Sequence, residues 1–193
     1  ETMSSMSAGM NVWNEMLSGE NGALVSDIVK EQYDVIYGRF PENYDEVVLL
    51  VNGRNEISDM VLYAIGLTTM DALMESMQAT MNGEEITQDL GPWSYEEICN
   101  MKFRVIPGAE KYRKQSDGSY ADLTASEAGL SYLYENAGFD LKIVGVLRPN
   151  KDAVAVSMDG AIAYTAALTE YVMQMNSDSE VLKAQLADKG TDI

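Results

Sequence analysis

Two short apolar runs constrain the fold of this chain more than any other feature of its sequence. Glu46–Val51 and Leu141–Leu147 are rich in valine, leucine and isoleucine, and glycine or proline follows each of them closely. Such runs are typical of buried central strands. Lys102–Ile106, where polar and apolar residues alternate, and residues 161–165 are also predicted to be extended. We therefore expect a small mixed or antiparallel sheet.

Amphipathic segments between these strands predict helices that cover one face of the sheet, which gives an α+β fold. The apolar spacing predicts helices at residues 12–17, 23–30, 59–66, 69–81, 124–136, 167–175 and 177–187. Capping boxes are predicted at Ser94 with Glu97 and at Thr124 with Glu127, and Asp117-Gly118 indicates a hairpin tip. The 193 residues are enough for a single domain, 1–193. Within it, residues 68–138 are expected to form a mainly helical inserted lobe.

The charge balance excludes several classes of partner. The chain has 31 acidic and 13 basic residues, a net charge of −18. Nucleic acids and anionic membrane surfaces are bound through basic patches, and only Lys111-Tyr112-Arg113-Lys114 is locally basic. We expect no nucleic-acid partner. Strong acidity favours a soluble, self-repelling surface, and a cationic partner is the alternative interpretation.

Residue types also limit the chemistry. The chain has no histidine and one cysteine, Cys99, which excludes Ser-His-Asp and Cys-His catalysis and zinc sites of His and Cys. The sequence contains no phosphate-binding loop motif and no EF-hand. We therefore predict no catalytic, cofactor-binding or metal-binding residues. An enzyme using carboxylates alone stays open as a rival, because Glu84/Glu85 and Glu96/Glu97 are adjacent acids, although such pairs arise by chance in so acidic a chain.

Two sets of side chains are candidates for binding a partner. Methionines recur at helical spacing within residues 69–81, and tyrosines gather within residues 112–134. Core packing is the simpler interpretation of the methionine stripe, and an adaptable peptide- or lipid-binding surface is the alternative. Tyrosine is favoured at interfaces. The candidate partner-binding residues are Met70, Met74, Met77, Met81, Tyr112, Tyr120, Tyr132 and Tyr134.

Three segments together resemble a known family. They are Tyr37-Gly38-Arg39-Phe40-Pro41-Glu42 with Glu46-Val47-Val48-Leu49 behind it, Asn55-Glu56-Ile57-Ser58-Asp59 leading to Leu62-Tyr63-Ala64-Ile65-Gly66-Leu67, and Leu141-Lys142-Ile143-Val144-Gly145-Val146-Leu147-Arg148-Pro149. Their order and spacing resemble the extracytoplasmic domain of FtsX-like and MacB-like bacterial ABC-transporter permeases. The resemblance covers roughly residues 33–67 and 139–172. The N-terminal residues depart from it, because no strand is predicted where the family's first strand leaves its first membrane helix.

The resemblance implies a non-catalytic domain on the extracytoplasmic side of the cell membrane. Its implied partners are its own transmembrane helices, a cytoplasmic ATPase domain or subunit, and an extracellular peptide, lipid or protein. Dimerisation is implied only for the full transporter. The chain does not begin with Met and contains no apolar run near the ~20 residues that a membrane span needs, so we expect any membrane anchor to lie outside residues 1–193. The alternative is a secreted or lipid-anchored protein that binds a peptide or glycan.

Overall fold

The computed structural model describes residues 12–83, 92–158 and 162–187. The chain divides into two compact units. The first holds Glu1–Met101 and Lys142–Thr165, and the second holds Lys102–Leu141 and Ala166–Ile193. Residues 68–138, expected as one inserted lobe, are thus shared between the two units. The reason is that the helix predicted at 69–81 belongs to the first unit, whereas residues 102–138 belong to the second.

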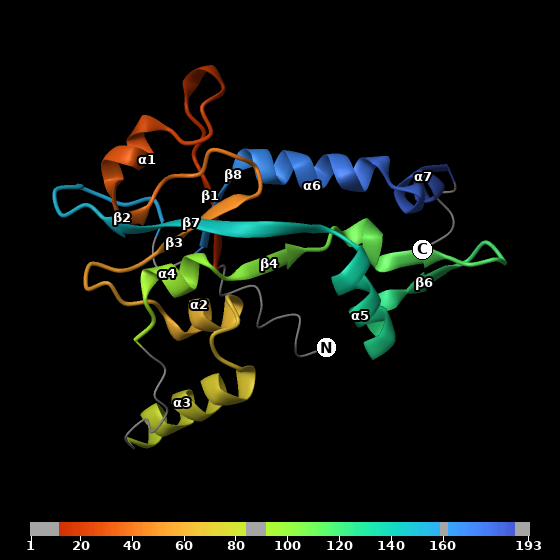
Figure 1. The fold of residues 1–193 in the computed structure, drawn as a ribbon, viewed down its shortest axis with the longest axis horizontal. Coiled ribbons are helices and arrows are strands. Elements are labelled where there is room, and N and C mark those ends of the chain that lie inside the picture. Colours follow the sequence, from red (N-terminus) through yellow and green to blue (C-terminus); the bar gives the residue numbers. More distant parts are fainter. Residues whose placement is uncertain (1–11, 84–91, 159–161, 188–193) are drawn as a thin grey trace. The chain divides into compact units, whose positions relative to one another are not determined.

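Strands form one mixed sheet and one short hairpin in the described part of the chain (Figure 1). The sheet runs β1-β8-β3-β7-β2, and β4 also pairs with β7. The pairs β1/β8 and β3/β7 are parallel, whereas β3/β8 and β2/β7 are antiparallel. The mixed sheet and α+β class are therefore confirmed. Its strands are β1 (Trp13–Met16), β2 (Tyr33–Gly38), β3 (Glu46–Leu50), β4 (Lys102–Val105), β7 (Phe139–Pro149) and β8 (Ile162–Thr165).

The first strand corrects a sequence prediction. Residues 12–17 were expected to be helical from their apolar spacing, but Trp13–Met16 forms β1. Trp13 pairs with Ile162 and Met16 with Thr165 in a parallel register. Four residues are too few for periodicity to separate a helix from a strand. Pairing with β8, far along the sequence, decides the conformation instead.

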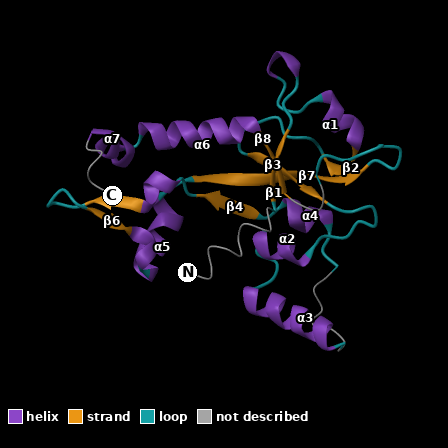
Figure 2. Ribbon diagram, turned by 180° about the vertical axis from the view of Figure 1, so that it is seen from behind, coloured by secondary structure: helices purple, strands orange, loops and turns teal. Residues whose placement is uncertain are grey.

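Helices of the first unit lie on both faces of the sheet, not on one as predicted. β3 is buried along all of its five residues. Val48 and Leu50 pack in a cluster with Val29 of α1, so the alternating Val47 and Leu49 face the opposite side. Figure 2 shows α1 (Asp27–Gln32) on one side of these strands and α2 (Asp59–Ala64) and α4 (Tyr95–Cys99) on the other. Because side chains pack against both faces of β3, successive positions along this strand are apolar and do not alternate with polar ones.

Hydroxyl side chains set the starts of the helices in the first unit. The Ser26, Ser58 and Thr69 oxygens each accept a hydrogen bond from the backbone N–H three residues later. Ser94 and Glu97 form the predicted capping box. These caps precede α1 (Asp27–Gln32), α2 (Asp59–Ala64), α3 (Met70–Asn82) and α4 (Tyr95–Cys99), and a single 3-10 turn occupies Glu20–Gly22.

The second unit contains the remaining elements. The predicted tip at Asp117-Gly118 joins the antiparallel strands β5 and β6. The cap of α5 is Ser126 and not Thr124, because Thr124 lies in the 3-10 turn Leu123–Ala125 and α5 begins only at Glu127. The Ser126 oxygen accepts from the Gly129 N–H at 3.1 Å, and the Thr124 hydroxyl donates to Asp122 at 2.6 Å. The elements are β5 (Tyr112–Lys114), β6 (Tyr120–Asp122), α5 (Glu127–Asn136), α6 (Ala166–Asp178) and α7 (Glu180–Ala187), with 3-10 turns at Gly108–Lys111 and Leu123–Ala125.

Candidate functional site

An ion pair closes the loop between β2 and β3. The Arg39 guanidinium donates to both carboxylate oxygens of Glu46, at 2.7 Å each. Glu46 also accepts from the Glu42 N–H at 2.8 Å and from the Asn43 side-chain amide at 3.0 Å. Five hydrogen bonds in all converge on this one carboxylate, including the Asn43 backbone N–H. We call Arg39, Asn43 and Glu46 the loop clasp.

The loop clasp keeps Glu46 ionised. The Arg39 hydrogen bonds, opposed by burial and aided by the N–H of Glu42 and the side chain of Asn43, lower the pKa of Glu46 from 4.5 to about 2. The Glu46 side chain is only 6% exposed. A general acid or base needs a pKa near the working pH, so a carboxylate held this far below neutrality is suited to holding the loop and not to transferring protons.

Two glycines bring this loop against β7. Gly38 has a φ of +69°, and a side chain there would collide with the backbone of Val144 and Gly145. A side chain at Gly145 would collide with the backbone of Arg39. The Arg39 N–H also donates to the Val144 carbonyl at 3.0 Å. Gly145 therefore admits a close approach of the Arg39 backbone.

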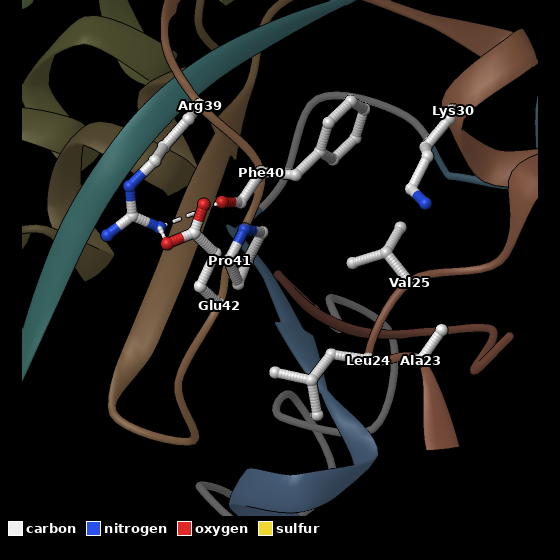
Figure 3. Close-up of a pocket in the computed structure, with 8 residues that line it drawn as sticks. All are labelled: Ala23, Leu24, Val25, Lys30, Arg39, Phe40, Pro41 and Glu42. Atoms are coloured by element: carbon white, nitrogen blue, oxygen red, sulfur yellow. Dashed lines mark hydrogen bonds and ion pairs between the residues drawn. The ribbon is translucent and has the colours of Figure 1, made fainter. Parts of the chain in front are cut away.

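A shallow pocket of about 470 Å³ lies beside the loop clasp. Figure 3 shows Leu24, Val25, Phe40 and Pro41 around it, with Lys30 reaching towards it from α1. Leu24 and Phe40 pack against the buried cluster of the sheet. The sequence did not point to this pocket, because residues 23–25 and 39–42 meet only through tertiary packing.

The charged residues of this pocket are all engaged in ion pairs. Lys30 pairs with Asp27 at 3.2 Å, and Arg39 pairs with Glu46 at 2.7 Å and with Glu42 at 3.7 Å. The pocket therefore presents an apolar floor with neutralised charges at its rim. Such a lining can hold a small apolar group, and it offers no activated nucleophile.

The structure brings the four candidate methionines together on an exposed face of α3. Met70, Met74, Met77 and Met81 are 41%, 55%, 52% and 87% exposed. Leu73 and Ser76 are the buried residues of this helix, and α3 packs against α2. The interpretation that the methionine stripe is core is therefore wrong. We call these four side chains the methionine face.

The four candidate tyrosines lie in the second unit. Tyr112 and Tyr120 belong to the paired strands β5 and β6. Tyr132 and Tyr134 are exposed on α5. The Arg113 guanidinium lies 5.2 Å from the ring centroid of Tyr132, a cation–π contact. Tyr134 borders a second shallow pocket of about 480 Å³ with Ile106 and Leu130.

Of the two pairs of adjacent glutamates considered for a carboxylate enzyme, only Glu96/Glu97 lies within the described residues. Glu97 accepts from the Ser94 N–H and hydroxyl at 2.8 Å each, and these bonds lower its pKa. Glu84 and Glu85 lie outside the described residues. Within the described ranges, no group of three or more His, Cys, Asp or Glu side chains is placed to hold a metal ion.

Among the described helices, none combines the length and the apolar character needed to cross a bilayer. No protein-family model matches the chain, and neither curated proteins nor solved structures show a significant similarity to it.

Proposed function

We propose that this chain is a non-catalytic extracytoplasmic domain of an ABC-transporter permease. In this proposal, the domain couples ATP-driven motion of a membrane part to export of a substrate or to action on an extracellular partner. Its own transmembrane helices and a cytoplasmic ATPase are the partners that the proposal requires. The proposal rests on the resemblance of three sequence segments and on how those segments meet in the fold.

The contact between Gly38-Arg39 and Val144-Gly145 is the observation that carries the proposal. The first pair belongs to the first resembling segment and the second pair to the last. Gly38 lies opposite Gly145 in the β2/β7 register, and β3 runs parallel to β7 beside them. The first and last resembling segments therefore lie side by side in one structural unit. This contact is expected if the chain shares the family's fold, and it is not expected if the resemblance arose by chance.

β1 supplies a second line of support. The sequence predicted no strand near the N-terminus, which was a departure from the family pattern. Trp13–Met16 nevertheless forms an edge strand parallel to β8. In the family that the sequence resembles, a strand follows the first membrane helix, and β1 agrees with that pattern.

The loop clasp suits a domain that transmits force. A bidentate arginine–carboxylate pair fixes direction as well as distance, and the five hydrogen bonds to Glu46 tie the β2–β3 loop to the start of β3. In the proposed role, this loop would stay attached to the sheet when a force acts on the first unit.

The reading frame on either side of residues 1 and 193 tests the proposal most directly. We expect apolar spans of ~20 residues on both sides and an ATP-binding cassette in the same or the next frame. A frame that encodes only a signal peptide and a stop codon would contradict the proposal. The secreted peptide- or glycan-binding protein would then be the reading to test.

Thiol labelling tests the location. Val154 is fully exposed, so Val154→Cys in a Cys99→Ser background gives this domain one accessible thiol within the full reading frame, and any cysteine elsewhere in that frame is replaced by serine. We expect a membrane-impermeant maleimide to label it in intact cells after any outer envelope barrier is permeabilised. The matched control is Cys99 alone, whose thiol is partly buried and has a raised pKa because of that burial. Labelling of Val154→Cys only after the cytoplasmic membrane is lysed would place the domain in the cytoplasm and end the proposal.

A further inference from the structure

We propose that the methionine face of α3 docks a cationic amphipathic segment of another protein. This inference is independent of the proposed function, because it depends only on α3 and its charge. The face consists of Met70, Met74, Met77 and Met81, which lie 41–87% exposed on one helix. No residue of this set contributes to the buried side of α3, where Leu73 and Ser76 lie.

Helix geometry makes these four side chains one continuous stripe. Positions three, four and seven apart lie on one face of a helix, and the methionines fall at the first, fifth, eighth and twelfth residues of α3. At 1.5 Å per residue the stripe is roughly 16 Å long. That length fits about three turns of a partner helix. Methionine side chains are flexible and polarizable, so they adapt to apolar partners of varied shape.

Charge selects among the possible occupants. α3 contains Asp71 and Glu75 and no lysine or arginine in its sequence, and the whole chain has a net charge of −18. A second copy would bring like charges together, and an anionic membrane surface would repel α3 for the same reason. A segment with an apolar face flanked by lysine or arginine would place opposite charges beside Asp71 and Glu75. The observations therefore favour a cationic polypeptide over the other two occupants.

A designed peptide provides the probe. The peptide is a helix of leucine and lysine alone, with leucines on one face, and its matched control has glutamate at every lysine position. The full 193-residue chain carries methionines labelled with carbon-13 in the methyl group. We expect the lysine peptide to shift the methyl resonances of the methionine face, and the glutamate peptide to shift none of them.

Matched substitutions assign the site. Met74→Gln with Met77→Gln removes apolar surface while keeping side-chain length and helix propensity. We expect this pair to raise the Kd for the lysine peptide at least roughly tenfold. Met173→Gln is the control, because Met173 is 63% exposed on α6 in the other unit; its Kd should stay unchanged. Met74→Leu with Met77→Leu keeps the apolar surface and should keep binding, which separates docking from a defect in folding.

Several results would overturn the inference. A Kd that is unchanged by the paired glutamine substitutions would place the peptide elsewhere on the acidic surface. Sedimentation showing a dimer that those substitutions dissociate would make a second copy the occupant. Binding to phosphatidylglycerol vesicles through the same methyl groups would show that a membrane surface, and not a polypeptide, occupies the methionine face. If the glutamine pair fails to fold, Asp71→Lys with Glu75→Lys replaces it, and unchanged affinity in that variant would equally contradict a cationic partner.

Discussion

Gly38 and Gly145 face each other where β2 meets β7, so close that a Cβ atom at Gly38 would lie 2.9 Å from the Gly145 Cα. Both positions exclude a side chain through contact with backbone, which cannot move aside as a flexible side chain can. This pair of residues, distant in sequence, fixes the β2–β3 loop against β7.

Gly145→Ala is therefore expected to destabilise the fold by about 1–3 kcal/mol, because the added methyl overlaps the Arg39 backbone. Urea unfolding followed by circular dichroism measures the change. Gly53→Ala is the control, since a Cβ there meets nothing within 4 Å, and its stability should change by less than about 0.5 kcal/mol. Equal effects at the two glycines would mean that the close approach does not exist.

The loop clasp predicts a pH dependence of stability. The pKa of Glu46 is lowered to about 2 from 4.5, mainly by the Arg39 hydrogen bonds. A lowered pKa in the folded state contributes stability that is complete above pH 4.5 and is lost as the pH falls through about 2. Glu46→Gln should therefore lose stability at pH 7, by about 1–3 kcal/mol, and show a smaller further loss on acidification than the parent chain.

Arg39→Gln provides the partner test for the same clasp. Because Arg39 is the main cause of the lowered pKa of Glu46, this variant should also flatten the acid limb of the stability profile between pH 4.5 and 2. The loss of unfolding free energy in the double variant, Arg39→Gln with Glu46→Gln, should be close to that of either single variant and well below the sum of the two. Additive effects in urea unfolding across that pH range would show that the two residues act separately.

The Tyr33 hydroxyl ties down the segment that follows β7. It accepts from the Met158 N–H at 2.6 Å and donates to the Met158 carbonyl, and Tyr33 is 2% exposed. Tyr33→Phe leaves both backbone groups buried without this partner, so we expect a loss of about 1–3 kcal/mol and faster hydrogen exchange at the Met158 amide. Tyr37→Phe alters an exposed hydroxyl on the same strand and should leave that amide protected.

Oxidation offers a simple test of the methionine face in the free protein. Met81 is 87% exposed, whereas Met16 is 1% exposed. Dilute peroxide should convert Met81 and its three partners on the methionine face to the sulfoxide well before Met16, because exposure governs access to the sulfur. Peptide mass spectrometry after timed quenching reads out the order. Early oxidation of Met16 would show that β1 does not stay paired with β8.

Long, strongly patterned segments could be predicted from the sequence. β3, β7 and α3 have patterns long enough to specify their type, and the Ser94–Glu97 capping box depends only on local spacing. The sequence also predicted the methionine stripe of α3, but it did not predict that this stripe is exposed. Which face of α3 is buried depends on α2, and the small Ser76 takes the buried position that hydrophobicity alone would give to a methionine.

Features that depend on distant partners could not be predicted. β1 is a strand only because β8 lies beside it. The pocket beside the loop clasp joins residues 23–25 to residues 39–42, and no local pattern records that meeting. The cap of α5 lies at Ser126 and not at Thr124, because Asp122 caps a 3-10 turn over residues 123–125 and α5 begins only at Glu127. The two hydroxyl residues are equally suitable local signals, so spacing alone does not choose between them.

The pairing of β1 with β8 also has a consequence for synthesis on the ribosome. β1 is made first, yet the strand beside which it lies ends at Thr165. At about 5–20 residues per second, Trp13 and Met16 are synthesised roughly 7–30 s before their partner residues in β8. During that interval the apolar side chains of β1 have no neighbouring strand to cover them. The last strand of the sheet to be translated therefore decides when the first one can fold.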